Sequence, residues 1–339
     1  MSEKLVYWLE ELRTDHNDIV GKKCANLGEM VRIGLPVPRG FALSVHTYSL
    51  FMDETGATDE VSKVLRTMNV AHTDMEGIKK LSTTLSQIIE SKPIPLELED
   101  VILSYYGNLC GRCKHTDVAV STRSAGAASH PGQYETYLNV KGETDLLEKI
   151  RKVWASTLNA RSITNRLRKG LPAVGVPIGV AVLEMVNARS AGIAFSVDPN
   201  TGDETRMIIE ANWGLGESVV SGKLIPDRWV LDKETCEVSE SHLGKKETWI
   251  LLASEGVIEQ KTPNEKSNTF CCTDTELSEI GRLVKELESH FNEPQDIEWA
   301  ITEDRGSPDV ILLQARPAVV VKKSASDAVL DMMVGMFRK

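Results

Sequence analysis

Three groups of residues in this sequence have side chains and spacing suited to phosphate chemistry. The first is Gly21-Lys22-Lys23, which stands just before Ala25-Asn26 at the expected start of a helix. The N–H groups of a first helical turn and the helix dipole attract an anion, and a lysine adds positive charge. The pattern alone leaves two interpretations open: a phosphate-binding lysine, or a lysine that is merely solvated at a helix start.

The second group is a loop rich in small residues over 121–133, which follows an expected strand over 117–120. Loops of glycine, alanine and serine let backbone N–H groups close around phosphate oxygens. Arg123, near the start of the loop, carries a planar guanidinium that can bind two phosphate oxygens at once. A flexible surface loop is the alternative, but the arginine at a strand end favours phosphate binding.

The third group lies on an expected β-hairpin toward the end of the sequence. Residues 296–301 and 310–316 alternate apolar and polar side chains, and a turn containing glycine and proline joins them over 303–309. Successive side chains of a strand point to opposite faces. Asp296 and Glu298 therefore share one face of the first strand.

The pairing of the two hairpin strands decides which polar groups meet. If Thr302 and Val310 are the paired ends, Glu298 lies opposite Gln314. In the same register Asp296 lies opposite Arg316. Such a hairpin gathers oxygen ligands beside a guanidinium, which suits a magnesium ion that holds nucleotide phosphates. A surface hairpin with exposed charges is the alternative.

The periodicity of apolar residues predicts the elements that position these groups. A short helix is expected before Gly21, then a helix over 25–33 and an apolar strand near Phe41. A polar helical segment is expected over about 50–115, and another helix over about 145–169. Four short apolar runs separated by turn residues then predict a mainly antiparallel sheet, over 178–186, 192–197, 206–210 and 227–232.

The composition is that of an ordinary globular protein of 339 residues. Its 39 basic and 49 acidic residues give a net charge of −10, which disfavours binding to nucleic acid or to an anionic membrane. The first residues lack the apolar core of a signal peptide, and no stretch approaches a membrane span. We expect a cytoplasmic protein with reduced cysteines, whose lone Cys110-Cys113 pair lacks the further ligands of a zinc site.

Taken together, the motifs resemble the nucleotide-binding part of the phosphoenolpyruvate synthase and pyruvate phosphate dikinase family. The resemblance covers roughly residues 15–320 and rests on several motifs in family order. These are Arg123-Ser124 followed by Gly132 to Asn139, Val153 to Ser156, Ser190 to Phe195, Asp198 to Gly202, and Asn212 to Glu217.

The resemblance implies an α+β, ATP-grasp-like fold of two lobes with mainly antiparallel sheets and an inserted helical segment. The first lobe would span 1–182, with the helical insertion at about 50–115. The second would span 183–322 and contain the metal-binding hairpin. A tail over 323–339 would be either a terminal helix packed on its own domain or a linker, and a helix that docks on a partner is a further alternative.

The resemblance also implies roles for individual residues, with ATP and Mg²⁺ as cofactors. Lys23, Arg123 and Arg316 would act on the phosphates, although Lys22 replaces a glycine of the usual motif and leaves open which lysine reaches them. Glu298 and Gln314 would hold the metal. The remaining nucleotide contacts would come from Lys22, Gly132, Gln133, Thr136, Glu184, Met185, Val186, Glu210, Glu217 and Asp296. Among these, Glu184-Met185-Val186 would be a hinge whose backbone groups receive adenine.

Family members generally carry the transferred phosphoryl group on a histidine in a Thr-Ser-His sequence. None of the seven histidines here stands in such a sequence. We therefore expect a phosphotransferase subunit that cleaves ATP to AMP and phosphate and works with a larger partner subunit bearing a swivelling phosphohistidine. The known split member, phenylphosphate synthase, makes phenol the first candidate acceptor. Two alternatives are the ATP-binding part of a phosphoenolpyruvate synthase or rifampin phosphotransferase, and a non-catalytic module that responds to ATP.

Overall fold

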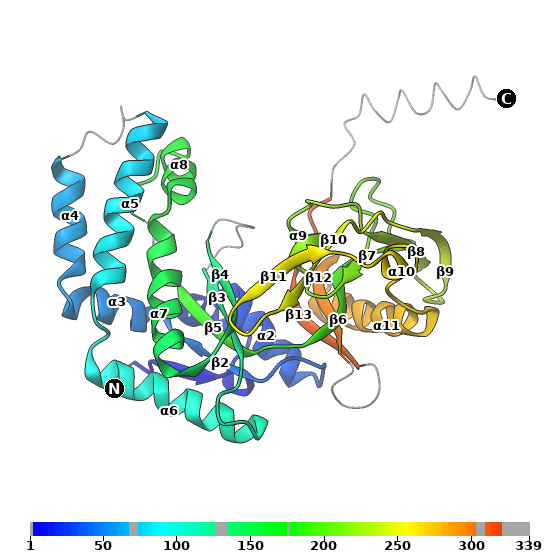
Figure 1. The fold of residues 1–339 in the computed structure, drawn as a ribbon, viewed down its shortest axis with the longest axis horizontal. Helices are drawn as coiled ribbons and strands as arrows, with labels where there is room; N and C mark the ends of the chain where they lie inside the picture. Colours follow the sequence, from blue (N-terminus) through cyan, green and yellow to red (C-terminus); the bar gives the residue numbers. More distant parts are fainter. Residues whose placement is uncertain (1–2, 68–73, 127–133, 175–176, 303–308, 321–339) are drawn as a thin grey trace. The chain divides into compact units, whose positions relative to one another are not determined.

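The computed structural model describes residues 3–67, 74–126, 134–174, 177–302 and 309–320. The chain forms two compact units, one of Met1–Val186 with Leu252–Ile258 and one of Asn187–Leu251 with Glu259–Lys339. Both units combine helices with antiparallel sheet (Figure 1), so the expected α+β, ATP-grasp-like fold class is confirmed. Each unit is described below by itself.

The first unit is built on a five-stranded sheet in the order β1-β2-β5-β3-β4. All four pairings of neighbouring strands are antiparallel. The strands are β1 (Val6–Trp8), β2 (Gly40–Leu43), β3 (Val120–Ala125), β4 (Thr136–Val140) and β5 (Gly179–Glu184).

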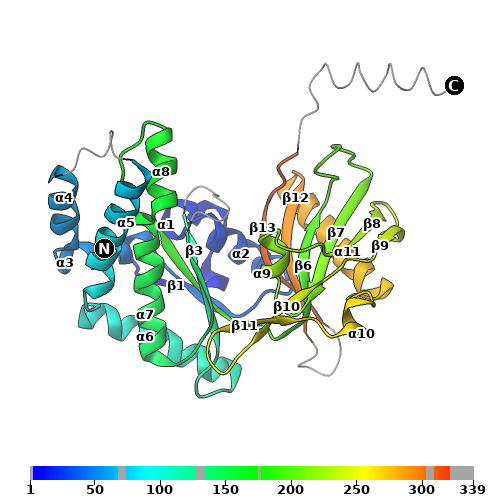
Figure 2. The ribbon, with the colours of Figure 1, turned by 45° about the horizontal axis from the view of Figure 1, so that its top comes forward.

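Helices cover both faces of this sheet (Figure 2). Six of them share one apolar core with Val120, Val180 and Val182 of the sheet. They are α3 (Val45–Glu54), α4 (Ala57–Thr67), α5 (Met75–Ser91), α6 (Leu96–Cys113), α7 (Gly142–Ala155) and α8 (Ala160–Arg168). The short helix α1 (Asn17–Val20) and α2 (Lys22–Arg32) lie on the other face. The helical segment expected over 50–115 is thus present as parts of four helices.

The short helix expected before Gly21 is present as α1, but strand β1, which the periodicity did not predict, precedes it. Trp8 of β1 packs on the rings of Phe41 and Tyr105, and the segment pairs with β2. One local expectation for this unit is wrong. The single helix expected over 145–169 is interrupted between α7 and α8. There the Asn159 side chain accepts the N–H of Ser162 at 2.7 Å and starts a new helix as its N-cap.

The second unit is built on a six-stranded antiparallel sheet in the order β13-β12-β6-β7-β8-β9. Its strands are β6 (Ala188–Phe195), β7 (Arg206–Trp213), β8 (Asp227–Asp232), β9 (Val238–His242), β12 (Gln295–Thr302) and β13 (Asp309–Pro317). Three of the four predicted apolar runs correspond to β6, β7 and β8, and the first corresponds to β5.

Helix α11 (Asp274–Phe291) covers one face of the second sheet. Thr273 and Glu276 form a capping box at its start, and Glu276 also binds Arg189 at 2.8 Å. The very short helices α9 (Glu217–Val220) and α10 (Asn264–Ser267) lie in the same unit. A separate two-stranded hairpin, β10 (Thr248–Leu252) and β11 (Val257–Lys261), completes the fold.

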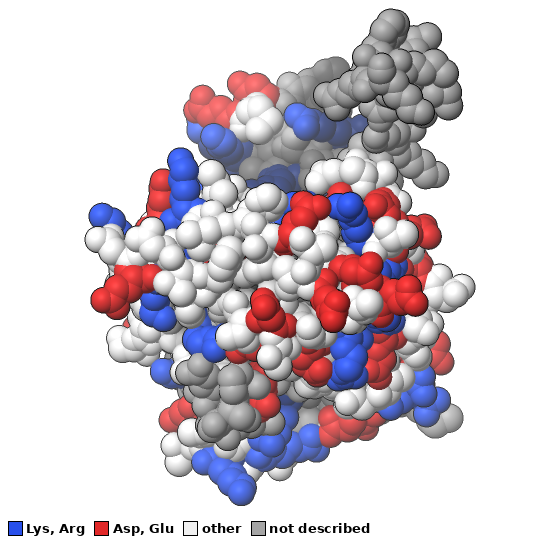
Figure 3. Space-filling view, turned by 90° about the vertical axis from the view of Figure 1, so that its right-hand side faces the viewer, with Lys and Arg blue, Asp and Glu red and all other residues white. Residues whose placement is uncertain are grey.

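The surface carries both signs of charge. On the face shown in Figure 3, Lys and Arg lie interspersed among Asp and Glu. Exposed ion pairs of the second unit, such as Arg206 with Glu240 and Arg282 with Glu279, contribute to this mixture. Within the part of the chain that the structure describes, we find no helix long and apolar enough to cross a membrane.

Two helical glycines of the first unit allow a direct test of the packing around α2. A Cβ at Gly28 would lie 2.3 Å from the Leu12 Cβ, whereas a Cβ at Gly107 in α6 would meet no atom within 4 Å. We expect Gly28→Ala to lower the free energy of unfolding by about 1–3 kcal/mol, because the preceding segment must move away. Gly107→Ala should raise it by about 0.5–1 kcal/mol through helix propensity. Urea denaturation of both variants measures this, and equal effects of the two changes would contradict the packing described.

Candidate functional site

The start of α2 in the first unit is fixed by a close backbone contact. Gly21 has φ +82°, and a Cβ there would lie 2.1 Å from the carbonyl oxygen of Ala125 at the end of β3. The N–H of Lys22 donates to the carbonyl of Gly126 at 2.9 Å. Only glycine tolerates both this φ and this approach. The helix start that carries Lys22 and Lys23 therefore lies against the end of β3.

Arg123 lies within β3, and not in the loop where the sequence pattern placed it. The strand extends to Ala125 because 120–125 pair along their whole length with β5. Arg123 is also in register with Thr136, the first residue of β4. Arg123 and Thr136, which were both predicted to contact the nucleotide, are thus direct cross-strand neighbours. Gly132 and Gln133, like most of the small-residue loop, lie outside the described residues.

A buried thiol is affected by two of the predicted cations. Cys24, in the first turn of α2, is fully buried, and burial raises the pKa of its thiol to about 12. The charges of Lys23 and Arg123 both act on this thiol and oppose that rise. Lys23 and Arg123 therefore lie near the same sulfur atom. Both side chains are half-buried, so positive charge gathers where α2 begins beside β3.

The expected hinge continues β5 and is held by two backbone hydrogen bonds. The N–H of Glu184 donates to the carbonyl of Arg39 at 2.7 Å, and the N–H of Met185 donates to the carbonyl of Ala119 at 2.8 Å. The N–H groups of Glu184 and Met185 are thus already hydrogen-bonded within the first unit. An adenine bound here would therefore have to use the carbonyl groups of the segment or the N–H of Val186. Glu184 is three residues from Ala181, the β5 partner of Arg123, or about 10 Å along the strand.

In the second unit, the hairpin places its polar groups opposite one another as predicted. Glu298 pairs with Gln314, and Asp296 pairs with Arg316. The expected end of the hairpin is wrong by one residue, because Thr302 pairs with Asp309 and not with Val310.

A register shift after Glu298 reconciles these two results. Trp299 pairs with Leu312, so Leu313 is the additional residue of a β-bulge in β13. The bulge offsets the one-residue error at the hairpin end, and the polar pairs meet in the predicted register.

The register across the whole sheet extends this polar pair into a transverse row. Glu298 is opposite Ile193 of β6, which in turn is opposite Glu210 of β7, and Glu210 is opposite Arg228 of β8. Directly opposed residues of an antiparallel sheet share a face. Gln314, Glu298, Glu210 and Arg228 therefore lie on one face, which we call the polar face. About 10 Å, or two strand spacings, separates the backbones at Glu298 and Glu210.

Helix α11 packs on the opposite face of this sheet. A Cβ on Gly281 of α11 would lie 3.1 Å from the Met207 side chain and 3.2 Å from that of Leu231. Met207 is three residues before Glu210, so the two side chains point to opposite faces. The polar face is thus the one that α11 leaves uncovered.

Helix α9, with Glu217 as its first residue, lies on the polar face. A Cβ on Gly216 would lie 3.5 Å from the Cβ of Ala191, which shares the face of Ile193 two residues further along β6. Glu217 is exposed. The structure thus places Glu210, Glu217, Asp296, Glu298, Gln314 and Arg316 on or beside one face of one sheet. Lys22, Lys23, Arg123, Thr136 and the hinge belong to the other unit.

Charges on the polar face are partly buried and partly compensated. Arg316 binds the carboxylate of Asp296 with Nη2 at 2.6 Å and Nε at 2.7 Å. Burial raises the pKa of Asp296, Glu298 adds to the rise, and Arg316 opposes it. Burial likewise raises the pKa of Glu210, which Arg228 opposes from 3.7 Å. Desolvation outweighs the neighbouring arginine in both cases.

Arg228 is a member of this face that the sequence analysis missed. The residue stands in the predicted strand 227–232, but strand periodicity alone does not reveal which strand lies beside Glu210. Its half-buried guanidinium is a cation of the polar face additional to Arg316. In the described ranges of the chain we find no cluster of three His, Cys, Asp or Glu side chains suited to a metal. Protein oxygen ligands for a metal here would be the Glu298 carboxylate and the Gln314 amide.

The Asp296–Arg316 pair predicts a pH-dependent effect on stability. Arg316→Met removes the partner of a largely buried carboxylate and should cost about 2 kcal/mol at neutral pH. The folded-state pKa of Asp296, already above its usual 3.8, would rise further. The folded variant would then bind a proton at Asp296 more tightly than the unfolded chain does. The loss of stability is therefore complete above the folded-state pKa of Asp296 and disappears as the pH falls toward 3.8.

Guanidinium denaturation from pH 7.5 downward measures this penalty. Arg282→Met, which breaks exposed ion pairs on α11, is the matched control and should change little. A penalty for Arg316→Met that is the same at every pH would contradict the burial of Asp296.

Comparison with known proteins shows the family to which this chain belongs. Residues 17–334 match the family model of the pyruvate phosphate dikinase AMP/ATP-binding domain. A probable phosphoenolpyruvate synthase of Methanothermobacter thermautotrophicus is 36% identical over 330 residues, which cover 96% of this chain and 47% of that protein. A probable phosphoenolpyruvate synthase of Methanocaldococcus jannaschii is 34% identical over 335 residues, covering 96% of this chain and 28% of that protein.

The phosphoenolpyruvate synthase of Aeropyrum pernix is 32% identical over 364 residues, covering 97% of this chain and 44% of that protein. The chain therefore spans about half the length, or less, of the curated relatives it matches. The matched family model covers nearly the whole chain, as do the alignments to these relatives. This chain belongs to the family of pyruvate phosphate dikinase AMP/ATP-binding domains.

Proposed function

We propose that this chain binds Mg²⁺-ATP and performs the nucleotide-dependent part of a phosphoenolpyruvate synthase reaction. The observation that carries the proposal is the polar face of the second unit. There the Glu298 carboxylate of β12 lies opposite the Gln314 amide of β13. Asp296, whose carboxylate is bound by Arg316, lies two residues before Glu298. Polyphosphate chemistry needs fixed cations and metal-binding oxygens more than it needs a protein nucleophile.

The donor set of the hairpin fits Mg²⁺ in this role. Magnesium prefers hard oxygen ligands, and in phosphoryl-transfer sites it takes one or two from the protein and the rest from phosphates and water. The Glu298 carboxylate and the Gln314 amide oxygen, which the register places opposite each other, supply that number. When bound, the metal would neutralise phosphate charge during transfer. Arg316 stays fixed by Asp296 and presents its charge beside these ligands.

The first unit, taken by itself, carries further residues that would suit phosphate and adenine. Lys23 and Arg123, which both act on the buried Cys24 thiol, form a compact group of cations at the start of α2. The hinge continues the same β5 strand that pairs with β3 at Arg123. Fixed cations of this kind act by positioning the phosphates and by stabilising charge that develops in transfer.

The acceptor of the phosphoryl group would be a histidine outside the described residues. In this scheme the histidine attacks the β-phosphorus and AMP leaves. Water then cleaves the carried pyrophosphoryl group, which releases inorganic phosphate and leaves a phosphohistidine. The histidine would belong either to a further domain or to a partner subunit. The relatives reported above are all named phosphoenolpyruvate synthase, which favours pyruvate over phenol as the final acceptor. A non-catalytic module that responds to ATP would bind nucleotide but support no exchange between ATP and AMP.

The cross-strand pair allows a test that depends on the register. Glu298→Gln should weaken Mg²⁺-ATP binding by about tenfold to a hundredfold, because the metal loses its charged ligand. Adding Gln314→Glu restores one carboxylate and one amide at the same two positions, so the double variant should recover part of the affinity. Isothermal titration calorimetry with and without Mg²⁺ measures both effects. Glu240→Gln, on exposed strand β9 of the same sheet, is the control.

Two outcomes of this titration would count against the proposal. If the unaltered chain shows no Mg²⁺-dependent ATP binding, the proposed function is wrong. If it binds but the double variant is weaker than Glu298→Gln alone, the two residues do not share a metal.

The location of the phosphocarrier gives a separate prediction. Incubated alone with ATP labelled at the β-phosphate, this chain should retain no acid-labile label, because a site built for positioning does little for an unpositioned nucleophile. Addition of a phosphohistidine domain from a phosphoenolpyruvate synthase of this family should produce label on that domain and exchange between ATP and AMP. His130 is the one internal candidate, because it stands inside the expected phosphate loop, and it lies outside the described residues. Label on this chain that disappears with His130→Ala would overturn the prediction.

A further inference from the structure

The segment between β7 and α9 is held by an unusually complete set of polar contacts. Asn212, near the end of β7, is fully buried. Its amide nitrogen donates to the Ser218 hydroxyl of α9 at 3.1 Å and to the carbonyl of Thr248 at 2.8 Å. Its amide oxygen accepts the N–H of Trp213 at 2.8 Å. One side chain thus joins the end of β7, the helix α9 and the strand β10.

Backbone contacts attach the same segment to β10. The N–H of Leu215 donates to the carbonyl of Ile250 at 2.8 Å. Gly214 has φ +75°, and a Cβ there would lie 2.3 Å from that carbonyl oxygen. The close approach therefore requires glycine. The Trp213 indole N–H donates to the carbonyl of Lys266 at 2.8 Å, and the Lys266 ammonium lies 3.9 Å from the centre of the indole ring.

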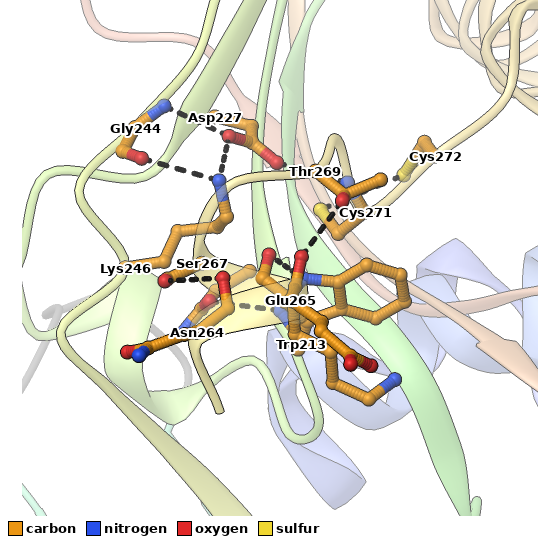
Figure 4. Close-up of polar contacts among 12 residues, drawn as sticks. Trp213, Asp227, Gly244, Lys246, Asn264, Glu265, Ser267, Thr269, Cys271 and Cys272 are labelled. Carbon is orange, nitrogen blue, oxygen red and sulfur yellow. Dashed lines mark hydrogen bonds and ion pairs between the residues drawn. The ribbon is translucent and has the colours of Figure 1, made fainter. Parts of the chain in front are cut away.

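Strand β10 is in turn anchored by a buried ion pair (Figure 4). The Lys246 ammonium contacts the Asp227 carboxylate, and both side chains are fully buried. Asp227 also accepts the N–H of Gly244 at 2.8 Å and the N–H of Cys271 at 2.9 Å. Lys246 has φ +42°, a left-handed conformation that is strained for a non-glycine residue. The ion pair and its hydrogen bonds hold the chain in this conformation two residues before β10 begins.

These contacts end at an exposed residue of the helix that rests on the polar face. Glu217 is the first residue of α9, directly before Ser218, and α9 rests on β6 and β7. The Glu217 side chain is exposed, so it is not one of the buried groups that hold α9 in place. A helix of four residues has little stability of its own and takes its position from the contacts that hold it. The place of Glu217 beside the polar face is therefore set by Asn212 and β10.

We propose that Asn212 is a positioning residue of the nucleotide site, which holds α9 so that Glu217 faces the bound nucleotide. The inference rests on the proposed function, since it requires ATP to bind at the polar face. Asn212 itself is buried and would not touch the ligand. Its effect on binding must pass through Glu217.

A double-mutant cycle tests this dependence. Asn212→Ala removes all three contacts, and Ser218→Ala removes only the link to α9, which keeps the test valid if the first variant folds poorly. Each should weaken Mg²⁺-ATP binding, Asn212→Ala by about tenfold, which corresponds to the loss of one or two hydrogen bonds. In a Glu217→Gln background the same changes should weaken binding by less than about twofold, because the group that they position is already altered.

Ser221→Ala is the matched control. Its hydroxyl donates to the carbonyl of Ser218 at the other end of α9 and contacts neither Asn212 nor Glu217 in that bond. The control should leave ATP affinity unchanged. Dissociation constants come from calorimetry, and urea denaturation without nucleotide measures the loss of stability separately.

The outcomes separate this inference from the proposed function. No ATP binding by the unaltered chain would overturn both. Normal binding by the unaltered chain, with equal penalties for Ser218→Ala in the presence and absence of Glu217, would overturn the positioning role and leave the proposed function standing. A penalty that disappears in Glu217→Gln supports the role, since a general loss of stability would act equally in both backgrounds.

Discussion

The antiparallel register of the six-stranded sheet is the constraint on which the candidate site depends. A shift of one residue would turn every side chain of a strand to the other face. The bulge at Leu313 brings Gln314 opposite Glu298 although the hairpin closes one residue earlier than simple alternation predicts. The pairing then continues through Ile193 to Glu210 and places carboxylates of two separate strands on one face. Helix α11 covers the other face, so the apolar core and the polar face are separated by the sheet itself.

The first unit uses a different constraint for the same kind of chemistry. Its cations come from a helix start and from a strand, and they meet because Gly21 lets α2 begin against the carbonyl of Ala125. A side chain at position 21 would push the helix start away from β3 and from Arg123. Cys24 is buried in the first turn of α2, and burial keeps the pKa of its thiol high, so that this thiol stays neutral. In both units the backbone fixes the charges before any ligand binds, as catalysis by electrostatic stabilisation requires.

The sequence predicted those parts of the fold and site that depend on local patterns. Strand alternation and a turn rich in Gly and Pro are local, and they predicted the pairs Glu298–Gln314 and Asp296–Arg316. These pairs form because the bulge at Leu313, which was not predicted, offsets the one-residue error at the hairpin end. The N-terminal strand β1 could not be predicted in this way, because Trp8 is held by Phe41 and Tyr105 from distant parts of the chain. Arg228 was missed for the same reason, since only the strand order of the folded sheet reveals its neighbour Glu210. The motif resemblance identified the family correctly, whereas it pointed to phenylphosphate synthase and the relatives reported above are named phosphoenolpyruvate synthase.

The central claim is that nucleotide phosphates bind at the polar face of the second unit. Paramagnetic line broadening in NMR spectra of the deuterated chain with Mn²⁺-ATP tests it most directly, because the ion broadens nearby amide signals whatever its effect on activity. The account predicts the strongest broadening at Glu298 and Gln314, with Glu210 next and the α11 amides least affected. Broadening centred on α11 or on the helices α3–α6, with the signals of β12 and β13 unchanged, would contradict it.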